Sequence, residues 1–233
     1  MGKINKRYDR RTAVSVVIAN MIGTGVFTSL GFQLLDIHSA PVILLLWFVG
    51  GVSALCGALC YSELSAALPR SGGEYNFIGS IYHPGLGFVS GWISATIGFA
   101  APTALVAITS ATYLNTVNPN IPITIFATLL VILISLFHLF NRSSSSTFQV
   151  IFTGVKVALI FVFIVCALLF SDQYQNLRWT PNFTDFSVIS EGSFAIALIY
   201  VSYAYTGWNA ATYLAGEVED VQKEMPRVLI TGT

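Results

Sequence analysis

Two threonine-glycine steps lie in the middle of apolar runs, and their residue types suit the binding of a small ligand. The first step is Gly23-Thr24-Gly25, and the second is Thr206-Gly207, which places the two threonines 182 positions apart (206 − 24). Glycine inside a helix costs about 1 kcal/mol relative to alanine, so helical continuity is weakest at these steps. One such step alone more often marks close packing of two helices. The pair predicts two helices that are each broken near the middle.

A broken helix inside a membrane exposes backbone groups that need polar partners. Each free N–H or C=O would cost several kcal/mol in lipid. The helix N-terminus at Thr24 and Gly25 offers donors and a positive dipole to a carboxylate, whereas free carbonyls at Met21, Tyr203 and Thr206 offer acceptors to an ammonium group. An α-amino acid carries both groups close together. Paired breaks in two halves of a chain are also typical of secondary transporters built from inverted repeats.

Lys156 is the single charged residue in the run of 29 residues from Ser143 to Ser171, where it stands fourteenth. By helical rise it lies roughly 20 Å from either end, too deep to reach water easily. This placement costs about 2.5–3.5 kcal/mol, and no acidic residue is expected at the same depth. We therefore expect its ammonium group to bond the carbonyls freed by the first break, where it would replace a sodium ion or titrate. The alternative is a lysine that lines a water-filled crevice and takes no part in coupling.

The elements that must position these groups follow from the spacing of charges, because only 9% of the residues are charged and 55% are hydrophobic. An apolar stretch of about 20 residues spans the hydrocarbon core as a helix. The gaps between charges fit six crossings, so the predicted fold class is an all-α polytopic membrane protein. The first five helices would form one repeat and the sixth would begin a second, inverted one. The six helices are expected at 12–36 (broken near 23–25), 40–66, 84–115, 122–141, 144–171 and 191–216 (broken near 206–207).

The remaining segments predict how the chain sits in the membrane. Residues 1–11 form a basic tail, 67–83 a re-entrant or interfacial segment, 172–190 an outer loop, and 217–233 a cytoplasmic loop that leads to a seventh helix. With the N-terminus inside, nine basic residues face the cytoplasm and Arg178 faces outward, as the positive-inside bias requires. We expect an integral protein of a bacterial inner (plasma) membrane with a cytoplasmic N-terminus.

Composition argues against several other classes of function. Eleven basic and eleven acidic residues cancel, so no net field attracts nucleic acid. No serine-histidine-carboxylate set clusters at one depth, and the cysteines lack the spacing of a disulfide framework or a zinc site. The sequence therefore predicts no enzyme, no metal and no cofactor. The cysteines, all in apolar runs, are Cys56, Cys60 and Cys166.

Together, the motifs resemble the amino acid–polyamine–organocation superfamily, and within it the L-type amino acid transporter-like branch. The matching pieces are IGTGVF at 22–27, YSEL at 61–64, PRSGGEY at 69–75, YAYTGWN at 203–209, EVED at 217–220 and Pro226-Arg227. The resemblance implies a fold of five-plus-five inverted repeats and amino acid exchange or uptake by alternating access. Relatives carry ten to twelve spans. We therefore expect this chain to be the N-terminal half of a protein, unable to transport without the missing C-terminal half.

The resemblance also implies roles for single residues. The glycine-rich loop of the first span binds the substrate carboxylate, and an aromatic residue of the sixth span, here Tyr203, closes over the substrate. Asn209 matches a polar residue near the amino end of the substrate, and Lys156 matches the lysine of Na⁺-independent members. Most relatives have phenylalanine or tryptophan where this chain has Tyr203. The predicted substrate site comprises Met21, Ile22, Gly23, Thr24, Gly25, Tyr203, Thr206, Gly207 and Asn209, with Lys156 as the coupling residue.

These features predict a Na⁺-independent secondary transporter, a permease or exchanger, of neutral α-amino acids. The alternative is a membrane sensor that binds an amino acid through the same breaks without moving it. A channel would need a ring of like charges or carbonyls around a pore, and the sequence has no such repeat. The expected partners are the amino acid substrate and the lipid bilayer, while the substrate side chain, the choice between exchange and proton symport, the oligomeric state and any partner subunit stay open.

Overall fold

The computed structural model describes residues 8–140, 142–170 and 178–233, which are almost entirely helical. Two isolated β-bridges join distant segments, Tyr8 with Val218 and Ser39 with Arg178. The described part of the chain is therefore all-α, as the sequence predicts. In chain order its elements are α1 (Arg10–Met21), α2 (Thr24–Asp36), α3 (Ala40–Ala67), α4 (Glu74–Ile81), α5 (Pro84–Ile93), η1 (Ser94–Ala100), α6 (Ala101–Val117), α7 (Ile123–Phe140), α8 (Arg142–Phe170), α9 (Thr184–Ser190), α10 (Gly192–Ala204), η2 (Ala210–Glu217) and α11 (Val221–Gly232).

Several helices have the length and surface of membrane spans. Three stretches of the described chain are long and apolar enough to cross a bilayer: Ala40–Ala67, Pro84–Val117 and Ser146–Phe170. Two further apolar helices are shorter: Ile123–Leu139 and Gly192–Ala204. Large apolar side chains face outward, such as Leu133 and Phe163, each 64% exposed. Water penalises such exposure and lipid does not, so the chain has the architecture of a polytopic membrane protein.

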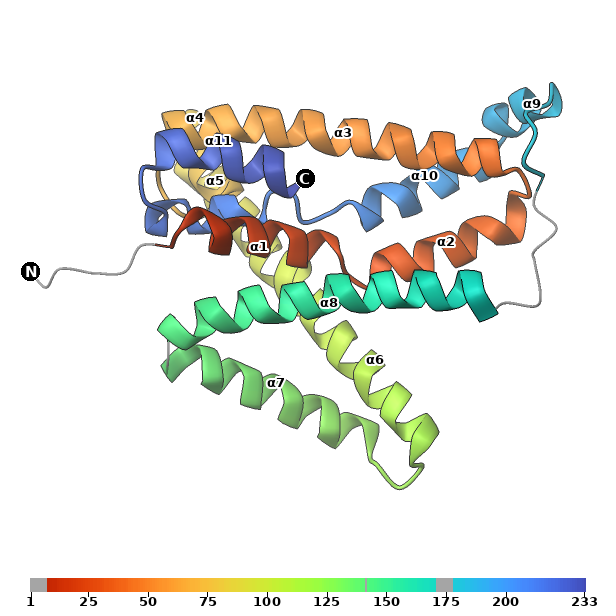
Figure 1. The fold of residues 1–233 in the computed structure, drawn as a ribbon. Helices are drawn as coiled ribbons and strands as arrows, with labels where there is room; N and C mark the ends of the chain where they lie inside the picture. The colour runs from red at the N-terminus through yellow and green to blue at the C-terminus, as the bar shows by residue number, and fades with distance from the viewer. Residues whose placement is uncertain (1–7, 141, 171–177) are drawn as a thin grey trace, which may run out of the picture.

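The first span is interrupted at Ile22 and Gly23, next to the predicted threonine-glycine step. α1 ends at Met21 and α2 begins at Thr24. Gly23 is extended, with φ −112° and ψ −166°, and is the N-cap residue of α2. Figure 1 shows α1 and α2 nearly end to end, with α8 alongside α1.

The second break lies in residues 205–209, between α10 and η2. These residues form turns, and η2 then continues as a 3₁₀ helix. Gly207 has φ +106°, a left-handed conformation that glycine adopts without a steric penalty. The predicted helix at 191–216 is therefore two shorter pieces joined at the glycine.

The helix α11 differs from the sequence prediction, which assigned 217–233 to a loop. It packs along α3 and α1 and buries Met225, Val228 and Leu229 completely. Pro226 lies inside the helix, and together with the neighbouring charges it favours a loop. The prediction was wrong because three apolar residues at helical spacing gain more from burial than the helix loses at one proline.

The segment at 67–83 contains a tight glycine turn followed by the short helix α4. Gly72 has φ +117° and Gly73 has φ +50°, so the chain reverses just before Glu74. α4 then packs closely on α5. The two backbones approach so closely that a Cβ on Gly87 would lie 2.6 Å from the Cα of Gly79. The turn and α4 direct Glu74 toward η2.

The two β-bridges bring segments together at opposite ends of the broken first span. Tyr8 N donates to the Glu217 carbonyl at 2.7 Å, so the start of α1 lies beside the end of η2. Ala40 N donates to the Arg178 carbonyl at 2.9 Å, so the connection from α2 to α3 lies beside the segment that precedes α9. Segments predicted on one side of the membrane are therefore neighbours in space.

Candidate functional site

The two helix breaks contact each other directly. A Cβ on Gly207 would lie 2.7 Å from the Cβ of Asn20, so the second break approaches the last turn of α1 as closely as backbones allow. One turn further along, a Cβ on Gly25 would lie 3.3 Å from the Cα of Ala204 and from the ring of Tyr203. α10 packs along α2 on the same side. The broken ends of both spans therefore meet at one place, where the sequence predicts a shared site.

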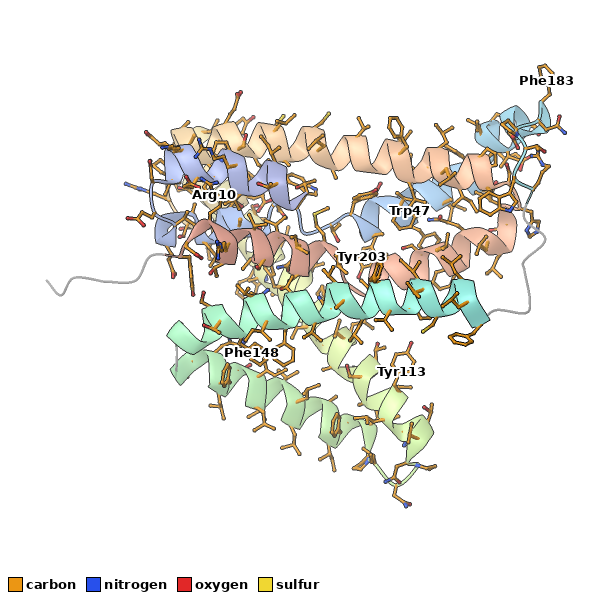
Figure 2. The ribbon with its side chains drawn as sticks, viewed as in Figure 1. Arg10, Trp47, Tyr113, Phe148, Phe183 and Tyr203 are labelled. Atoms are coloured by element: carbon orange, nitrogen blue, oxygen red, sulfur yellow. The ribbon has the colours of Figure 1, made fainter. Side chains whose placement is uncertain are left out.

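A cavity of about 990 Å³ lies at this meeting point. It takes residues from both breaks, from α8, from α6 and η1, and from the start of α4. Figure 2 shows Tyr203 beside the gap between α1 and α2. Thr24, also predicted for the site, is the first residue of α2, and its side chain lies outside the described part of the structure. Nine predicted residues line the cavity: Met21, Ile22, Gly23, Gly25, Lys156, Tyr203, Thr206, Gly207 and Asn209.

The N-terminus of α2 supplies hydrogen-bond donors to the cavity. The first four N–H groups of an α-helix lack acceptors within the helix, and the helix dipole adds partial positive charge there. In α2 these groups begin at Thr24, and the N-cap residue Gly23 contributes no side-chain acceptor. Gly23 and Gly25 both line the cavity, so these two positions place no side chain of their own over the first turn of α2. This end of the cavity suits a carboxylate.

Lys156 binds the backbone of the first break from α8. Its Nζ donates to the carbonyl of Ile22 at 2.8 Å and to the carbonyl of Ala19 at 3.0 Å. Both carbonyls lie where α1 ends, so the contact expected from the sequence is present. An ammonium group has three donors, and two of them are used here. Within the described part of the chain, the ammonium group of Lys156 is therefore bonded by backbone oxygen atoms rather than by a carboxylate.

Two of the three carbonyl groups that the sequence predicts to be free, those of Met21 and Tyr203, accept hydrogen bonds within the chain. The Met21 carbonyl accepts from Gly23 N at 3.0 Å. The Tyr203 carbonyl accepts from Thr206 N at 3.1 Å and from Thr206 Oγ1 at 2.6 Å. The expectation of empty acceptors at Met21 and Tyr203 was wrong, because the chain closes small turns as soon as each helix ends. The Tyr203 oxygen thus already accepts two hydrogen bonds.

Glu74 is a functional candidate that sequence reasoning missed. It is the first residue of α4 and lines the cavity from the side opposite the first break. Its carboxylate accepts hydrogen bonds from Asn209 Nδ2 and from the hydroxyl of Tyr213. Among the described residues that line the cavity, Glu74 and Lys156 are the charged ones. The sequence signal was the glycine pair before Glu74, which reverses the chain.

The apolar wall of the cavity comes from a π-helix that the sequence did not predict. η1 widens the helix between α5 and α6, and Pro102 follows it. Proline has no N–H and so weakens the regular ladder one turn earlier, and π-turns inside α-helices are frequent at functional sites. Ile97, Phe99 and Val106 of this stretch line the cavity beside Ile134 of α7. The wall therefore suits an apolar side chain.

One known protein family matches a range of residues that includes this whole site. Residues 9–233 match the family model described as amino acid permease, a range that includes both breaks, Lys156 and Glu74. The chain belongs to the amino acid permease family.

Three relatives of this chain are named as amino acid transporters. The mouse Asc-type amino acid transporter 1 is 32% identical over 226 residues, which cover 94% of this chain and 43% of that protein. The human large neutral amino acids transporter small subunit 2 is 27% identical over 226 residues, 94% of this chain and 42% of that protein. The human b(0,+)-type amino acid transporter 1 is 25% identical over 227 residues, which cover 95% of this chain and 46% of that protein. The permease chain spans less than half the length of these relatives.

These relatives bear on two further expectations from the sequence. Each of the three relatives is named as a transporter and none as an enzyme, which supports the expectation that this permease is not an enzyme. All three are mammalian, so the expected bacterial origin stays a prediction.

Proposed function

We propose that the complete protein carrying this chain is a secondary transporter that moves neutral α-amino acids by alternating access. The observation that carries the proposal is the meeting of two broken spans in one cavity, with Gly207 against Asn20. Broken helices supply backbone donors and acceptors inside a membrane at a point where an unbroken helix offers none. A zwitterion is the ligand that uses both.

The substrate carboxylate would bind at the N-terminus of α2. Gly23 and Gly25 line the cavity and place no side chain of their own over the backbone N–H groups of that first turn. The ammonium group would lie toward the second break, near the carbonyl of Thr206 and the side chain of Asn209. The side chain of the substrate would then face Ile97 and Phe99. These apolar surroundings favour neutral side chains over charged ones. Tyr203 lies against Gly25, in position to cover the bound molecule.

Lys156 would make transport independent of sodium. Its ammonium group already donates to the carbonyls of Ala19 and Ile22, which are the kind of oxygen ligands that a bound cation would need. A fixed cation at this place removes the requirement for a metal ion. It also couples the backbone of the first break to α8, so that movement of one element would move the other.

The six-span arrangement with a cytoplasmic N-terminus is also proposed. Two pairs of neighbours support it: the start of α1 lies beside the end of η2, and the α2–α3 connection lies beside Arg178. Odd and even connections are therefore segregated to opposite ends. Basic residues gather at the end that holds Arg10 and Arg227, as the positive-inside bias requires of a cytoplasmic face.

Transport is tested with the complete protein reconstituted in liposomes. Uptake of a labelled neutral amino acid in sodium-free buffer is expected to saturate and to rise when an unlabelled amino acid is present inside the vesicles. A panel of the twenty amino acids as competitors then defines the side-chain preference. Saturable binding without any flux would instead favour a membrane sensor. The absence of both binding and flux would overturn the proposal.

A further inference from the structure

The carboxylate of Glu74, which is outside the predicted site, is hydrogen-bonded to Asn209, which belongs to that site. Glu74 accepts one hydrogen bond from Asn209 Nδ2 and another from the hydroxyl of Tyr213, which lies one turn beyond Asn209. We propose that Glu74 is a positioning residue that orients the Asn209 amide, so that Asn209 Oδ1 faces the cavity as an acceptor for the substrate ammonium group. The inference rests on the proposed function, because it assigns the ammonium end of that site.

The chain around Glu74 is built to hold its position. The positive φ angles of Gly72 and Gly73 turn the chain, and a Cβ on Gly73 would lie 2.9 Å from the Thr212 hydroxyl. Two residues before Gly73, Ser71 Oγ accepts from Gly216 N at 2.9 Å. The segment 71–74 therefore contacts η2 along its length. Glu74 approaches the second break on a rigid turn rather than on a free side chain.

The chemistry of the two groups fixes the direction of the amide. An ionised carboxylate only accepts hydrogen bonds, whereas the asparagine side chain donates through its nitrogen and accepts through its oxygen. The nitrogen of Asn209 must therefore face Glu74, and the oxygen must face the other way. Asn209 lines the cavity, and the proposed orientation leaves its acceptor oxygen on that side. An ammonium group, which only donates, is the complementary ligand.

Tyr213 and Ser94 hold the second oxygen of the Glu74 carboxylate. The Tyr213 hydroxyl donates to Glu74, and its oxygen lies 3.1 Å from Ser94 Oγ. Because a hydroxyl has one hydrogen, Ser94 then donates to Tyr213. Phe99 packs edge-on against the ring of Tyr213 at 4.8 Å between ring centroids. The carboxylate is therefore held from two sides and cannot rotate away from Asn209 without breaking this chain of contacts.

The test compares three variants in the complete protein: Glu74→Ala, Asn209→Asp and the exchange Glu74→Gln with Asn209→Asp. Each is measured for binding of a neutral amino acid and of the same molecule lacking its amino group. Glu74→Ala is expected to weaken amino acid binding about tenfold and to leave binding of the deaminated acid unchanged, since one charge-assisted contact is lost. Asn209→Asp places two carboxylates together and is expected to weaken binding more. The exchange restores one amide and one carboxylate, and is expected to recover affinity to within about threefold of the parent.

Glu63→Gln is the matched control, because Glu63 is an exposed carboxylate on α3 away from the cavity. It is expected to bind like the parent protein. A double-mutant cycle of Glu74→Ala and Asn209→Ala on the melting temperature, without substrate, measures the contact itself. Non-additive effects are expected because the two side chains are bonded.

The outcomes separate this inference from the function on which it rests. The inference is overturned if the parent protein binds amino acids but Glu74→Ala weakens the amino acid and the deaminated acid equally, or if the exchange binds no better than Asn209→Asp alone. If the parent protein binds no amino acid, the proposed function fails and this inference fails with it. In that case a non-additive cycle would still identify Glu74 and Asn209 as a structural pair.

Discussion

Gly207 packs against Asn20, with 2.7 Å between the Cβ of Asn20 and the place where a Cβ of residue 207 would lie. This contact joins two segments that are far apart in sequence, and it makes one site out of two breaks. It also requires a left-handed backbone at Gly207. A side chain there would separate the two breaks and widen the cavity between them.

Substitution of this glycine is expected to destabilise the protein. Gly207→Ala must adopt a φ near +106° and must also push Asn20 away. The backbone strain alone costs about 1–3 kcal/mol. A lower melting temperature of the purified protein and weaker amino acid binding are expected. Gly192→Ala is the control, since nothing lies within 4 Å of its Cβ position. Equal melting temperatures for the two variants would contradict the contact.

A large side chain at Gly25 is expected to abolish substrate binding. A Cβ there already lies 3.3 Å from Ala204 and Tyr203, so the rest of a leucine would fill the place proposed for the carboxylate. Gly25→Leu is therefore expected to lower affinity at least a hundredfold, about 2.7 kcal/mol. Gly31→Leu, on the same helix with open space around it, is expected to bind normally. Undiminished affinity in Gly25→Leu would show that the carboxylate lies elsewhere.

Removal of the lysine ammonium group is expected to change how transport depends on cations and on pH. Lys156→Ala leaves the carbonyls of Ala19 and Ile22 without a donor, which opens a place for sodium or water. We expect flux to fall about tenfold, an amount typical of losing one charged hydrogen-bonded group. Flux measured with sodium and with choline from pH 6 to 8 checks this, with Lys223→Ala on the exposed face of α11 as control. Normal turnover and an unaltered profile would identify Lys156 as a bystander.

An ion pair between the N-terminal segment and α11 predicts a pH dependence of stability. Arg10 donates to Glu224 Oε1 at 2.8 Å, and Arg227 does so at 3.2 Å. The hydrogen bond from Arg10, followed by the charges of Arg10 and Arg227, lowers the pKa of Glu224 below its ordinary value of 4.5. A lowered pKa stabilises the folded state fully above pH 4.5, and the effect is lost as pH falls through the folded pKa.

Melting temperatures of the parent protein and of Glu224→Gln measure this effect. The parent is expected to be the more stable of the two above pH 4.5, with the difference shrinking at lower pH and in 1 M salt. The exposed Glu219→Gln on the same connection is the control and is expected to follow the parent. A difference between Glu224→Gln and the parent that does not vary with pH would contradict the assignment.

The helix breaks could be predicted from the sequence because their signal is local. Gly23 and Gly207 interrupt apolar runs. Because glycine has a low helix propensity, the helix is weakest at these residues, and it ends close to each of them. The partner of Lys156 was predictable because a buried ammonium group needs acceptors, and the carbonyls freed by the first break were the best available ones. The first inference depends on residues within one span, and the second depends on how few hydrogen-bond acceptors are available to Lys156.

The rest of the site depends on contacts between distant segments, which a local pattern does not encode. Glu74 reaches Asn209 because Gly72 and Gly73 turn the chain by angles that the sequence permits but does not require. The π-helix η1 comes just before Pro102, whose missing N–H weakens the helical ladder there without by itself specifying a π-turn. The α11 helix forms because its apolar face finds α1 and α3, although Pro226 within it is a helix breaker by itself.

The central claim is that an amino acid binds both breaks at once, and hydrogen–deuterium exchange of the complete protein tests it most directly. Addition of a neutral amino acid is expected to protect the amides of residues 19–25 and 205–209 together, whereas its deaminated and decarboxylated analogues at equal concentration are expected to protect them much less. Protection of only one break, or equal protection by the three compounds, would contradict the account.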